Sequence, residues 1–426
     1  MKSMERTIHL PHVFIDPLSS VRLRAVDGTA ASVNLPLVGW RGKQYKNEIR
    51  SAHDDANAAH AIDEMSPNFH DDSRWYRGMC HGSTYSVRIL VTGGAGFIGS
   101  RFVEYMLRHH SDYDVTVLDK LTYAGNTDNL KSVWDNPRFR FIHGDICSGE
   151  TVRVAMTGHS HVINFAAETH VDRSILDSGD FVRTDVEGTR VLLEEARRTG
   201  LERYLQVSTD EVYGDMAAPS RALEDTSLRP RSPYSASKAG GDLLVGAYHM
   251  TYNVPTLITR GSNTYGPYQY PEKLIPLFIT NALSGLPLPI YGDGLQVRDW
   301  LHVDDHCAGI ATVLERGRPG EIYNLGAGNE RVNLGIIEHI VQLTGCDPAL
   351  MRHIPDRPGH DRRYALDTKK AAALGWQPGV IFEDGLERTL KWYDENRQWW
   401  ERIKSGTFPD FYRQQYKGLE QGALDD

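Results

Sequence analysis

The sequence predicts an α/β fold in which helices cover both faces of a doubly wound parallel sheet. Two observations predict it. From Val87 onward, short apolar runs rich in β-branched residues alternate with helical patterns, which is typical of parallel strands joined by helices. After about Pro267 this alternation gives way to proline-rich turns. We therefore expect one large sheet domain followed by a smaller C-terminal lobe.

Six strands and three helices are expected in order along the chain. The strands are expected at Val87–Thr92, Val115–Asp119, Phe139–Gly144, His161–Ala167, Tyr204–Ser208 and Thr256–Arg260. Phe102 and Met106, which are four residues apart, predict a helix after the first strand. Longer helical patterns span Phe181–Arg198 and Ser235–Tyr252.

The chain divides into three parts. Residues 1–86 hold ten basic and ten acidic residues, with no sustained period of 2 or 3.6. They are expected to be a poorly ordered N-terminal extension, or an upstream region translated from an early start site. A small appended domain is the alternative. Residues 87–265 are assigned mainly to the sheet domain, and residues 266–426 mainly to the smaller lobe, with segments that return to the sheet.

Composition excludes several classes of function. The formal net charge is −9 and no block of lysine or arginine appears, so nucleic acid is not an expected partner. No apolar run approaches the roughly 18 residues of a membrane helix, and the N-terminus lacks a signal-peptide pattern. The cysteines, Cys80, Cys147, Cys307 and Cys346, are too scattered for a zinc cluster or a disulfide framework. A cytoplasmic protein without a bound metal is expected.

A glycine-rich turn follows the first predicted strand. Gly93, Gly96 and Gly99 give the spacing G-x-x-G-x-x-G, which allows a tight turn, a close approach to a pyrophosphate and close packing of helix on strand. The following helix would present its N-terminus to the phosphates. Asp119 ends the second predicted strand, where a carboxylate accepts hydrogen bonds from a ribose diol and disfavours NADP. The pattern predicts a Rossmann-type NAD site; a tight turn with a structural aspartate is the alternative.

Tyr234 and Lys238 open a predicted helix after Pro233. Because residues four apart share a helix face, both side chains are expected to point the same way. A nearby ammonium lowers the pKa of a phenol, so we expect Lys238 to make Tyr234 a base for a sugar hydroxyl during hydride transfer.

Two adjacent carboxylates, Asp210 and Glu211, follow Thr209 at the end of the fifth predicted strand. Ligands bind at the carboxyl ends of strands in open α/β sheets. If both side chains enter a closed pocket, repulsion and burial raise at least one pKa, so that one group acts as an acid and the other as a base. The alternative is a solvated acidic turn.

Together these motifs resemble the extended short-chain dehydrogenase/reductase superfamily, and in detail the dTDP-glucose 4,6-dehydratase family. The resemblance covers residues 87–393 and leaves residues 1–86 without a counterpart. The matching strings are TGGAGFIGS (92–100), LDKLTYAGN (118–126), GDI (144–146), AAETHVDRSI (166–175), STDEVYG (208–214), YSASK (234–238), SNTYGPYQYPEKLIP (262–276), PLPIYGDGLQVRDWLHVDDH (287–306) and DRPGHDRRYALD (356–367).

The resemblance implies a reaction on a nucleotide-diphosphate sugar. Tyr234, helped by Lys238, would take the proton of the glucose 4-hydroxyl while NAD⁺ takes the hydride from carbon 4. Glu211 would remove the proton from carbon 5, and Asp210 would protonate the leaving 6-hydroxyl. The hydride would return to carbon 6, and Thr209 would hydrogen-bond near the 4-hydroxyl. The product would be a 4-keto-6-deoxy sugar.

The resemblance also implies the contacts of cofactor and substrate. Those to NAD would come from Gly93, Gly96, Phe97, Ile98, Gly99, Asp119, Lys120, Leu121, Thr122, Asp145, Ile146, Ala166, Ala167, Thr184, Tyr234 and Lys238. Those to the nucleotide sugar would come from Thr169, Thr209, Asn263, Lys273, Leu274, Pro289, Ile290, Tyr291, Arg298, Asn333, Asp356, Arg357 and His360. Arg298 suits the diphosphate; its alternative is a surface ion pair with Asp299 or Asp304.

Two positions depart from the family pattern, because Thr264 and Asp185 stand where asparagine is common. Adjusted cofactor contacts are expected rather than loss of activity. His302 and His306 are expected to be structural, and a homodimer is expected. Other readings stay open: another nucleotide-sugar 4,6-dehydratase, an epimerase or a decarboxylase of this fold, or a catalytically silent NAD-binding protein. The Asp210–Glu211 pair argues against an epimerase.

Overall fold

The computed structural model describes residues 21–24, 30–33 and 87–405. The first two ranges belong to one unit of the chain and residues 87–405 to a second. In the first unit, β1 (Val21–Arg24) pairs antiparallel with β2 (Ala30–Val33). The expectation for residues 1–86 otherwise falls outside the described residues and stays a prediction.

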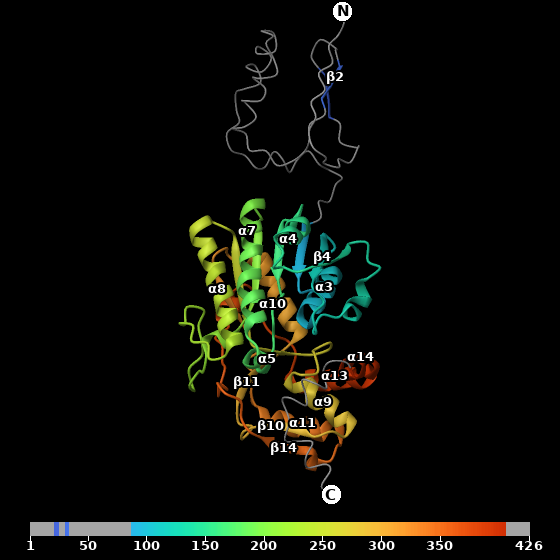
Figure 1. The fold of residues 1–426 in the computed structure, drawn as a ribbon, viewed down its shortest axis with the longest axis vertical. Coiled ribbons are helices and arrows are strands. Elements are labelled where there is room, and N and C mark those ends of the chain that lie inside the picture. Colours follow the sequence, from blue (N-terminus) through green and yellow to red (C-terminus); the bar gives the residue numbers. More distant parts are fainter. Residues whose placement is uncertain (1–20, 25–29, 34–86, 406–426) are drawn as a thin grey trace, which may run out of the picture. The chain divides into compact units, whose positions relative to one another are not determined.

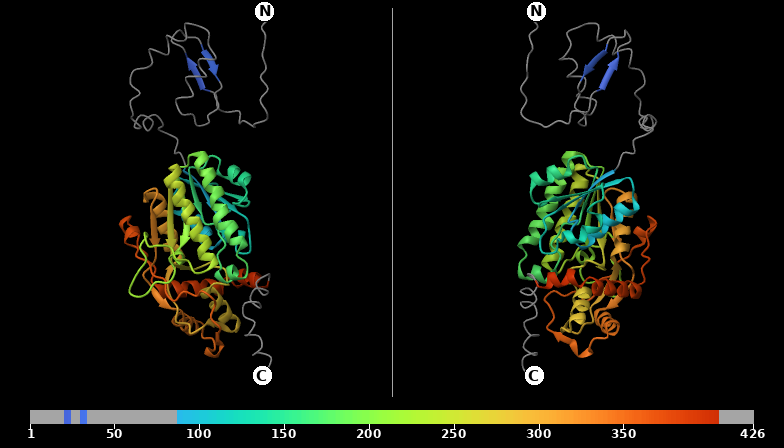
Figure 2. Two further views of the ribbon diagram at one scale, coloured as in Figure 1. Left: turned by 60° about the vertical axis from the view of Figure 1, so that its left-hand side comes forward. Right: turned by 90° about the vertical axis from the view of Figure 1, so that its right-hand side faces the viewer.

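A seven-stranded, fully parallel sheet forms the centre of the second unit (Figures 1 and 2). Its strands lie in the order β12-β8-β7-β6-β3-β4-β5. Their bounds are β3 Val87–Thr92, β4 Tyr113–Asp119, β5 Phe139–His143, β6 His161–Asn164, β7 Arg203–Thr209, β8 Thr256–Gly261 and β12 Ile322–Leu325. The strand order reverses between β3 and β6, which opens a crevice at their carboxyl ends. The predicted Rossmann-type fold is confirmed.

Helices cover both faces of the sheet (Figure 2). Ile89 and Val91 of β3 join the apolar core beneath α3 and α10, whereas Leu90 between them joins the core beneath α4, α7 and α8. Because alternate residues of a strand face opposite sides, two buried faces require the continuous apolar runs seen in the sequence. The covering helices are α3 Phe97–His109, α4 Gly149–Met156, α7 Thr189–Thr199, α8 Pro233–Tyr252 and α10 Val303–Arg316.

Shorter helical segments connect these elements. They are η1 Thr127–Val133, α5 Val171–Leu176, α6 Gly179–Phe181, η2 Val182–Gly188, η3 Asp210–Tyr213, η4 Pro348–Leu350 and α12 Lys369–Ala373. The predicted single helix Phe181–Arg198 is wrong in one respect, because its first part, η2, is a π-helix. The wider turn carries Asp185, whose buried carboxylate bonds to α8 and to the loop after β6.

The predicted strand His161–Ala167 is too long, since β6 ends at Asn164. Phe165 still donates its backbone N–H to Thr92, and the chain then leaves the sheet. Residues 165–169 line a pocket instead of pairing with a neighbour. The predicted strand Val87–Thr92 has the bounds of β3, and the other four predicted strands differ from the observed ones by one or two residues at one or both ends.

The C-terminal part builds a second core beside the sheet. Its helices are α9 Leu274–Ser284, α11 Asn333–Thr344, α13 Phe382–Glu395 and α14 Arg397–Ser405. Its strands are β9 Asn263–Tyr265, β10 Leu288–Tyr291, β11 Val297–His302, β13 Glu330–Val332 and β14 Met351–Ile354. β12 joins the main sheet and α10 packs on it, so the sheet and the second core are built from interleaved parts of the chain. The division at residue 265 stays a prediction.

Candidate active site

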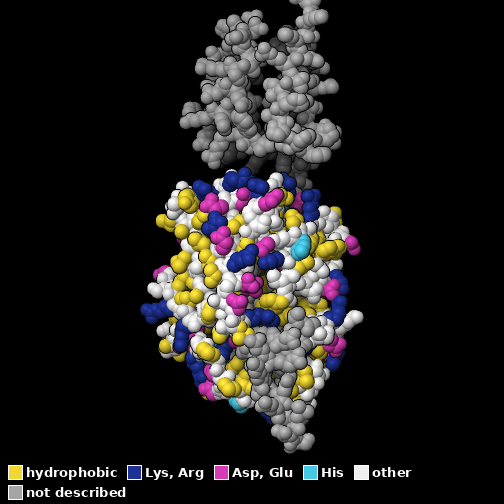
Figure 3. Space-filling model, viewed as in Figure 1, with side chains coloured by type: hydrophobic (Ala, Val, Ile, Leu, Met, Phe, Trp, Pro, Cys, Tyr) yellow, Lys and Arg dark blue, Asp and Glu magenta, His cyan; other side chains and the backbone are white. Residues whose placement is uncertain are grey.

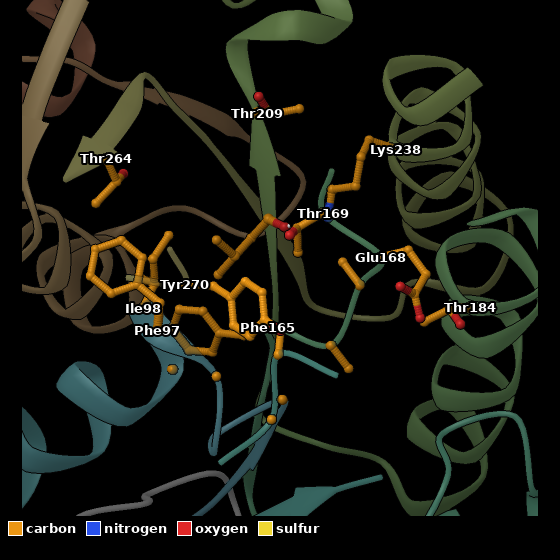
Figure 4. A pocket seen from close by; sticks show the side chains of 18 of the residues that line it. Phe97, Ile98, Phe165, Glu168, Thr169, Thr184, Thr209, Lys238, Thr264 and Tyr270 are labelled. Carbon is orange, nitrogen blue, oxygen red and sulfur yellow. Dashed lines mark hydrogen bonds between the residues drawn. The ribbon is translucent and has the colours of Figure 1, made fainter. Parts of the chain in front are cut away.

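Two pockets meet at the carboxyl ends of the central strands. The inner pocket is lined by the loops after β3, β4, β6, β7 and β8 and by the start of α8 (Figure 4). It brings together most of the predicted residues, namely Gly93, Gly96, Phe97, Ile98, Gly99, Asp119, Lys120, Thr122, Asp145, Ile146, Ala166, Ala167, Thr169, Thr184, Thr209, Asp210, Glu211, Tyr234, Lys238, Asn263 and Lys273. Segments far apart in the sequence therefore converge on one cavity.

The glycine turn forms a cradle at one end of the inner pocket. Gly93 has φ +69°, and a Cβ there would lie 2.5 Å from the backbone nitrogen of Ala166. A Cβ at Gly99 would collide with the carbonyl of Gly93. α3 begins directly after Gly96, and no side chain caps its N-terminus. The first N–H groups of α3 and its positive dipole end suit a phosphate.

Asp119 serves the glycine turn itself. Its Oδ2 accepts a hydrogen bond of 2.9 Å from the backbone N–H of Ala95, and its Oδ1 accepts one of 2.8 Å from that of Leu121. Burial raises the pKa of this carboxyl, although both backbone bonds act the other way. Asp119 therefore both stabilises the turn and lines the pocket. Leu121 does not line the pocket, because its side chain packs on the apolar core.

Tyr234 and Lys238 lie in the first turns of α8 and both line the inner pocket. Ser232 caps this helix, accepting a 3.0 Å hydrogen bond from the N–H of Ser235. The expected lowering of the Tyr234 pKa is wrong for this arrangement. Burial raises that pKa well above its usual range, with further upward contributions from Glu211 and Asp185, and the Lys238 ammonium instead donates to the Val207 carbonyl at 2.9 Å.

Asp210 and Glu211 are the first two residues of η3, directly after β7. The Thr209 hydroxyl accepts a 3.2 Å bond from the N–H of Glu211 and donates at 3.3 Å to Asp210 Oδ1. Asp210 is 3% exposed, which excludes the solvated acidic turn. Burial and the neighbouring Glu211 raise the pKa of Asp210 far above its usual value.

The two carboxyl groups differ in their surroundings. Burial also raises the pKa of Glu211, but the cationic side chains of Arg357, Lys273 and Arg298 act against it. Asp210 is therefore the better candidate for a protonated acid, and Glu211 for an ionised base. Two adjacent carboxyl groups need such different surroundings if one is to act as an acid and the other as a base.

The outer pocket adjoins the inner one and shares Glu211, Asn263 and Lys273 with it. The predicted substrate residues that line it are Leu274, Pro289, Ile290, Tyr291, Arg298, Asn333, Arg357 and His360. Asp356 does not line it; its carboxylate bonds instead to His360 at 2.6 Å and to the Gln296 amide at 3.2 Å.

Arg298 is buried and bonds to backbone carbonyls, so the surface ion pair with Asp299 or Asp304 is wrong. Its guanidinium lies 4.3 Å from the centre of the Tyr364 ring. Arg357 donates at 3.0 Å to buried Asp172, whose other oxygen accepts from the Tyr291 hydroxyl at 2.9 Å. Two guanidinium groups thus belong to one wall, which suits a diphosphate.

Sequence reasoning missed several residues of the inner pocket. Glu168 points toward Thr184 (Figure 4), and burial raises its pKa to about 7. Buried His306 also lines the pocket and is 2.7 Å from the Thr264 hydroxyl, so it joins the wall as well as the core. Glu168 directly follows the predicted residues Ala166 and Ala167, and this position next to a motif is the feature of the sequence that could have indicated it. No feature of the sequence indicated His306, because only the tertiary fold brings α10 to the site.

Asp185, the second departure from the family pattern, is buried between α8 and the pocket loop. Its Oδ2 accepts from the Ser237 hydroxyl at 2.5 Å, and its Oδ1 accepts from the N–H of Glu168 at 3.2 Å. Burial raises its pKa to about 6, against the opposing effect of Lys238. In the ranges that the structure describes, no group of histidine, cysteine and carboxylate side chains is arranged to hold a metal, and no helix is both long and apolar enough to cross a membrane.

Comparisons with known proteins agree with this geometry. The sequence model of GDP-mannose 4,6 dehydratases matches residues 90–389. A dTDP-glucose 4,6-dehydratase of Streptomyces niveus is 52% identical over 325 residues, which cover 75% of this chain and 96% of that protein. A dTDP-glucose 4,6-dehydratase of Escherichia coli is 45% identical over 354 residues, covering 76% of this chain and 98% of that protein.

Solved structures show the same similarity in three dimensions. A dTDP-glucose 4,6-dehydratase from Streptomyces venezuelae, with NAD and TYD bound, is 51% identical with a TM-score of 0.73, covering 74% of this chain and all of that one. A UDP-glucose 4-epimerase from Thermus thermophilus, in complex with NAD, is 32% identical with a TM-score of 0.68, covering 72% of this chain and 99% of that one.

Proposed function

The chain belongs to the dTDP-glucose 4,6-dehydratase family, and we propose that it is an NAD-dependent carbon–oxygen lyase. It converts dTDP-D-glucose to dTDP-4-keto-6-deoxy-D-glucose and water. One observation carries the proposal: Tyr234, Asp210 and Glu211 line a single pocket beside the glycine cradle. A site for sugar oxidation and a site for loss of water therefore coincide.

The residues of the inner pocket fit NAD. A Cβ at Gly93 or Gly99 would collide with neighbouring backbone, and one at Gly96 would lie 3.3 Å from the Gly93 carbonyl oxygen, so the glycines keep the backbone of this turn close and open to a pyrophosphate. Asp119 and Lys120 line the same pocket and would hold the adenosine ribose, and Lys120 forms an ion pair of 2.9 Å with Asp145. NAD bound there would supply the acceptor for the hydride of carbon 4 and the donor of that hydride to carbon 6.

The chain's own groups move the protons. Tyr234 accepts the proton of the 4-hydroxyl in its phenolate form, which the Lys238 ammonium one helical turn away favours against the effect of burial. Thr209 lines the same pocket and would hydrogen-bond to that oxygen. The ketone formed at carbon 4 acidifies carbon 5. Glu211 removes that proton while Asp210, kept protonated by burial, donates its own to the departing 6-hydroxyl. One water leaves, and a double bond joins carbons 5 and 6. When the hydride is delivered to carbon 6, carbon 5 takes a proton back from Glu211, and the proton that Tyr234 accepted restores the acid form of Asp210.

The outer pocket would hold the nucleotide part of the substrate. Arg298 and Arg357 face it from one side and suit the two phosphates. Leu274, Pro289 and Ile290 offer an apolar wall, and Asn333 adds an amide for the base or ribose. Since Lys273 lines both pockets, it stands where sugar and diphosphate join.

A homodimer and a cytoplasmic location are part of the proposal. Leu243 and Met250 of α8 are 66% and 82% exposed. They are seven residues apart and so share a helix face, in a region where Figure 3 shows hydrophobic side chains at the surface. A second copy of the chain would cover them. Cys147, Cys307 and Cys346 are free thiols, which is typical of a reducing compartment.

The proposed function is tested by incubating the purified protein with dTDP-glucose in heavy water, without added nicotinamide. Mass spectrometry and NMR then follow the sugar. Loss of one water with one deuterium at carbon 5 is expected, and it would also show that NAD remains bound during purification. An isomer of unchanged composition would overturn the proposal in favour of an epimerase, the activity of the Thermus thermophilus relative.

A further inference from the structure

The two halves of the candidate active site are carried by different elements. Tyr234 and Lys238 lie on α8, whereas Asp210 and Glu211 are the first two residues of η3. For one sugar to be oxidised and then dehydrated, both halves must keep a fixed relative position, since a misplacement of about 1 Å can slow a reaction about a hundredfold. The structure places a buried polar network directly behind them.

Arg260 of β8 is the centre of this network. Its Nε donates to Asp242 Oδ2 at 2.9 Å, and its Nη1 donates to the Tyr213 hydroxyl at 2.9 Å. Asp242 lies on α8, one helical turn beyond Lys238, and Tyr213 is the last residue of η3. The guanidinium therefore bonds to the helix that carries Tyr234 and to the turn that carries Glu211.

The network is buried and continues beyond Tyr213. The Tyr213 hydroxyl donates onward to Asn324 Oδ1 at 2.8 Å, which links η3 to β12. Arg260, Asp242, Tyr213 and Asn324 are all at most 3% exposed. In such surroundings a broken bond leaves a polar or charged atom without solvent, so the arrangement resists displacement. None of these four side chains lines either pocket.

Resting on the proposed function, we propose that Arg260 is a positioning residue that sets the place of the Asp210–Glu211 turn relative to the Tyr234 helix. Through Asp242 it holds α8, and through Tyr213 it holds η3. Tyr234 needs only α8 to reach the 4-hydroxyl. Glu211 reaches carbon 5 only while η3 keeps its place, so weakening the Tyr213 link affects the loss of water more than the oxidation.

The test compares two tyrosine-to-phenylalanine variants. Tyr213→Phe removes only the hydroxyl that bonds to Arg260. Tyr204→Phe is the matched control, because that buried hydroxyl makes a bond of equal length, 2.9 Å, to Gln206 on β7, away from Arg260. Each protein is mixed with dTDP-glucose, quenched after short intervals and examined by mass spectrometry. This separates the sugar that is oxidised but still carries its 6-hydroxyl from the dehydrated product.

In Tyr213→Phe, oxidation is expected within about twofold of the wild-type rate and loss of water about tenfold slower, equivalent to about 1.4 kcal/mol of activation free energy. The oxidised sugar then accumulates, and Tyr204→Phe shows no accumulation. Arg260→Lys should show the same split. Partial unfolding lowers both rates together and cannot produce it.

Equal slowing of both steps in Tyr213→Phe would overturn the proposal, as would the absence of any slowing or the same accumulation in Tyr204→Phe. A wild-type protein that leaves dTDP-glucose unchanged would instead overturn the proposed function. The two failures are therefore distinguishable within one experiment.

Discussion

The inner and outer pockets share three residues but are built in different ways. The inner pocket lies at the carboxyl ends of parallel strands, and its wall is set by backbone turns such as the one around Gly93 and by short segments that follow each strand. The outer pocket depends on side-chain bonds between distant elements, such as that between Asp172 on α5 and Arg357, 185 residues later. The inner pocket therefore suits the chemical steps, which need a rigid edge of the sheet. The outer pocket suits recognition of the substrate, on a wall that an ion pair holds in place.

This comparison predicts that changes in the inner pocket act on turnover, and changes in the outer pocket on substrate affinity. The largest effect is expected for Tyr234→Phe, because a phenyl ring cannot accept the 4-hydroxyl proton. The turnover number should fall by about a thousandfold, within the range of a lost general base. Steady-state kinetics of product formation measure this. A loss under tenfold would show that another group is the base.

Glu211→Gln is expected to slow the loss of water by about a hundredfold or more while oxidation continues, since only the carbon 5 proton loses its acceptor. Deuterium at carbon 5 and the mass of the sugar pool report the two steps. Dehydration at the parent rate would contradict the assignment of Glu211 as base. The variant separates the two chemical steps inside one pocket.

Asp172→Asn probes the outer pocket. Loss of its charge weakens the hold on Arg357, so KM for dTDP-glucose should rise about tenfold, with the turnover number within about twofold. Asp293→Asn is the matched control, because it breaks an Asp–Arg pair of 2.8 Å with Arg362 whose side chains are about half exposed. If Asp172→Asn lowered the turnover number and left KM unchanged, the division of labour between the pockets would be wrong.

The smallest effect on turnover is expected for Asp185→Asn, which keeps an acceptor for the Glu168 N–H and can donate to the Ser237 hydroxyl. The pKa of Asp185 is raised to about 6 from 3.8. The folded wild type therefore binds more protons than the unfolded chain in this window, and its free energy of unfolding falls as pH rises from about 4 to 6, by about 2–3 kcal/mol.

The Asn variant should lack this part of the pH dependence and be more stable than the wild type at pH 8. Urea unfolding at pH 4, 6 and 8 measures both proteins. Parallel curves for the two would mean that Asp185 does not carry the slope. A gain in stability would show that the inner pocket keeps buried carboxyl groups at a cost to the free energy of unfolding.

Much of the inner pocket could be predicted from the sequence. Gly93, Asp119 and the Asp210–Glu211 pair each follow an apolar run within a few residues, so a local pattern places them at the same edge of the sheet. The sequence carried no signal where side-chain direction decides, as for Leu121, which turns into the core, and Asp356, which bonds to His360. Neighbours in a string of matched residues can point in opposite directions.

The sequence by itself determined the order of strands and helices along the chain and the glycine cradle, because these depend on periodicity and on contacts between near neighbours, and the resemblance of its motifs supplied the candidate acid–base residues. Tertiary structure decided how the surroundings of the two carboxyl groups differ, where Lys238 donates, and that Arg260 stands behind both halves of the site. The physical reason is that burial and charge–charge effects arise from residues brought together by packing, and no local pattern in the chain encodes them.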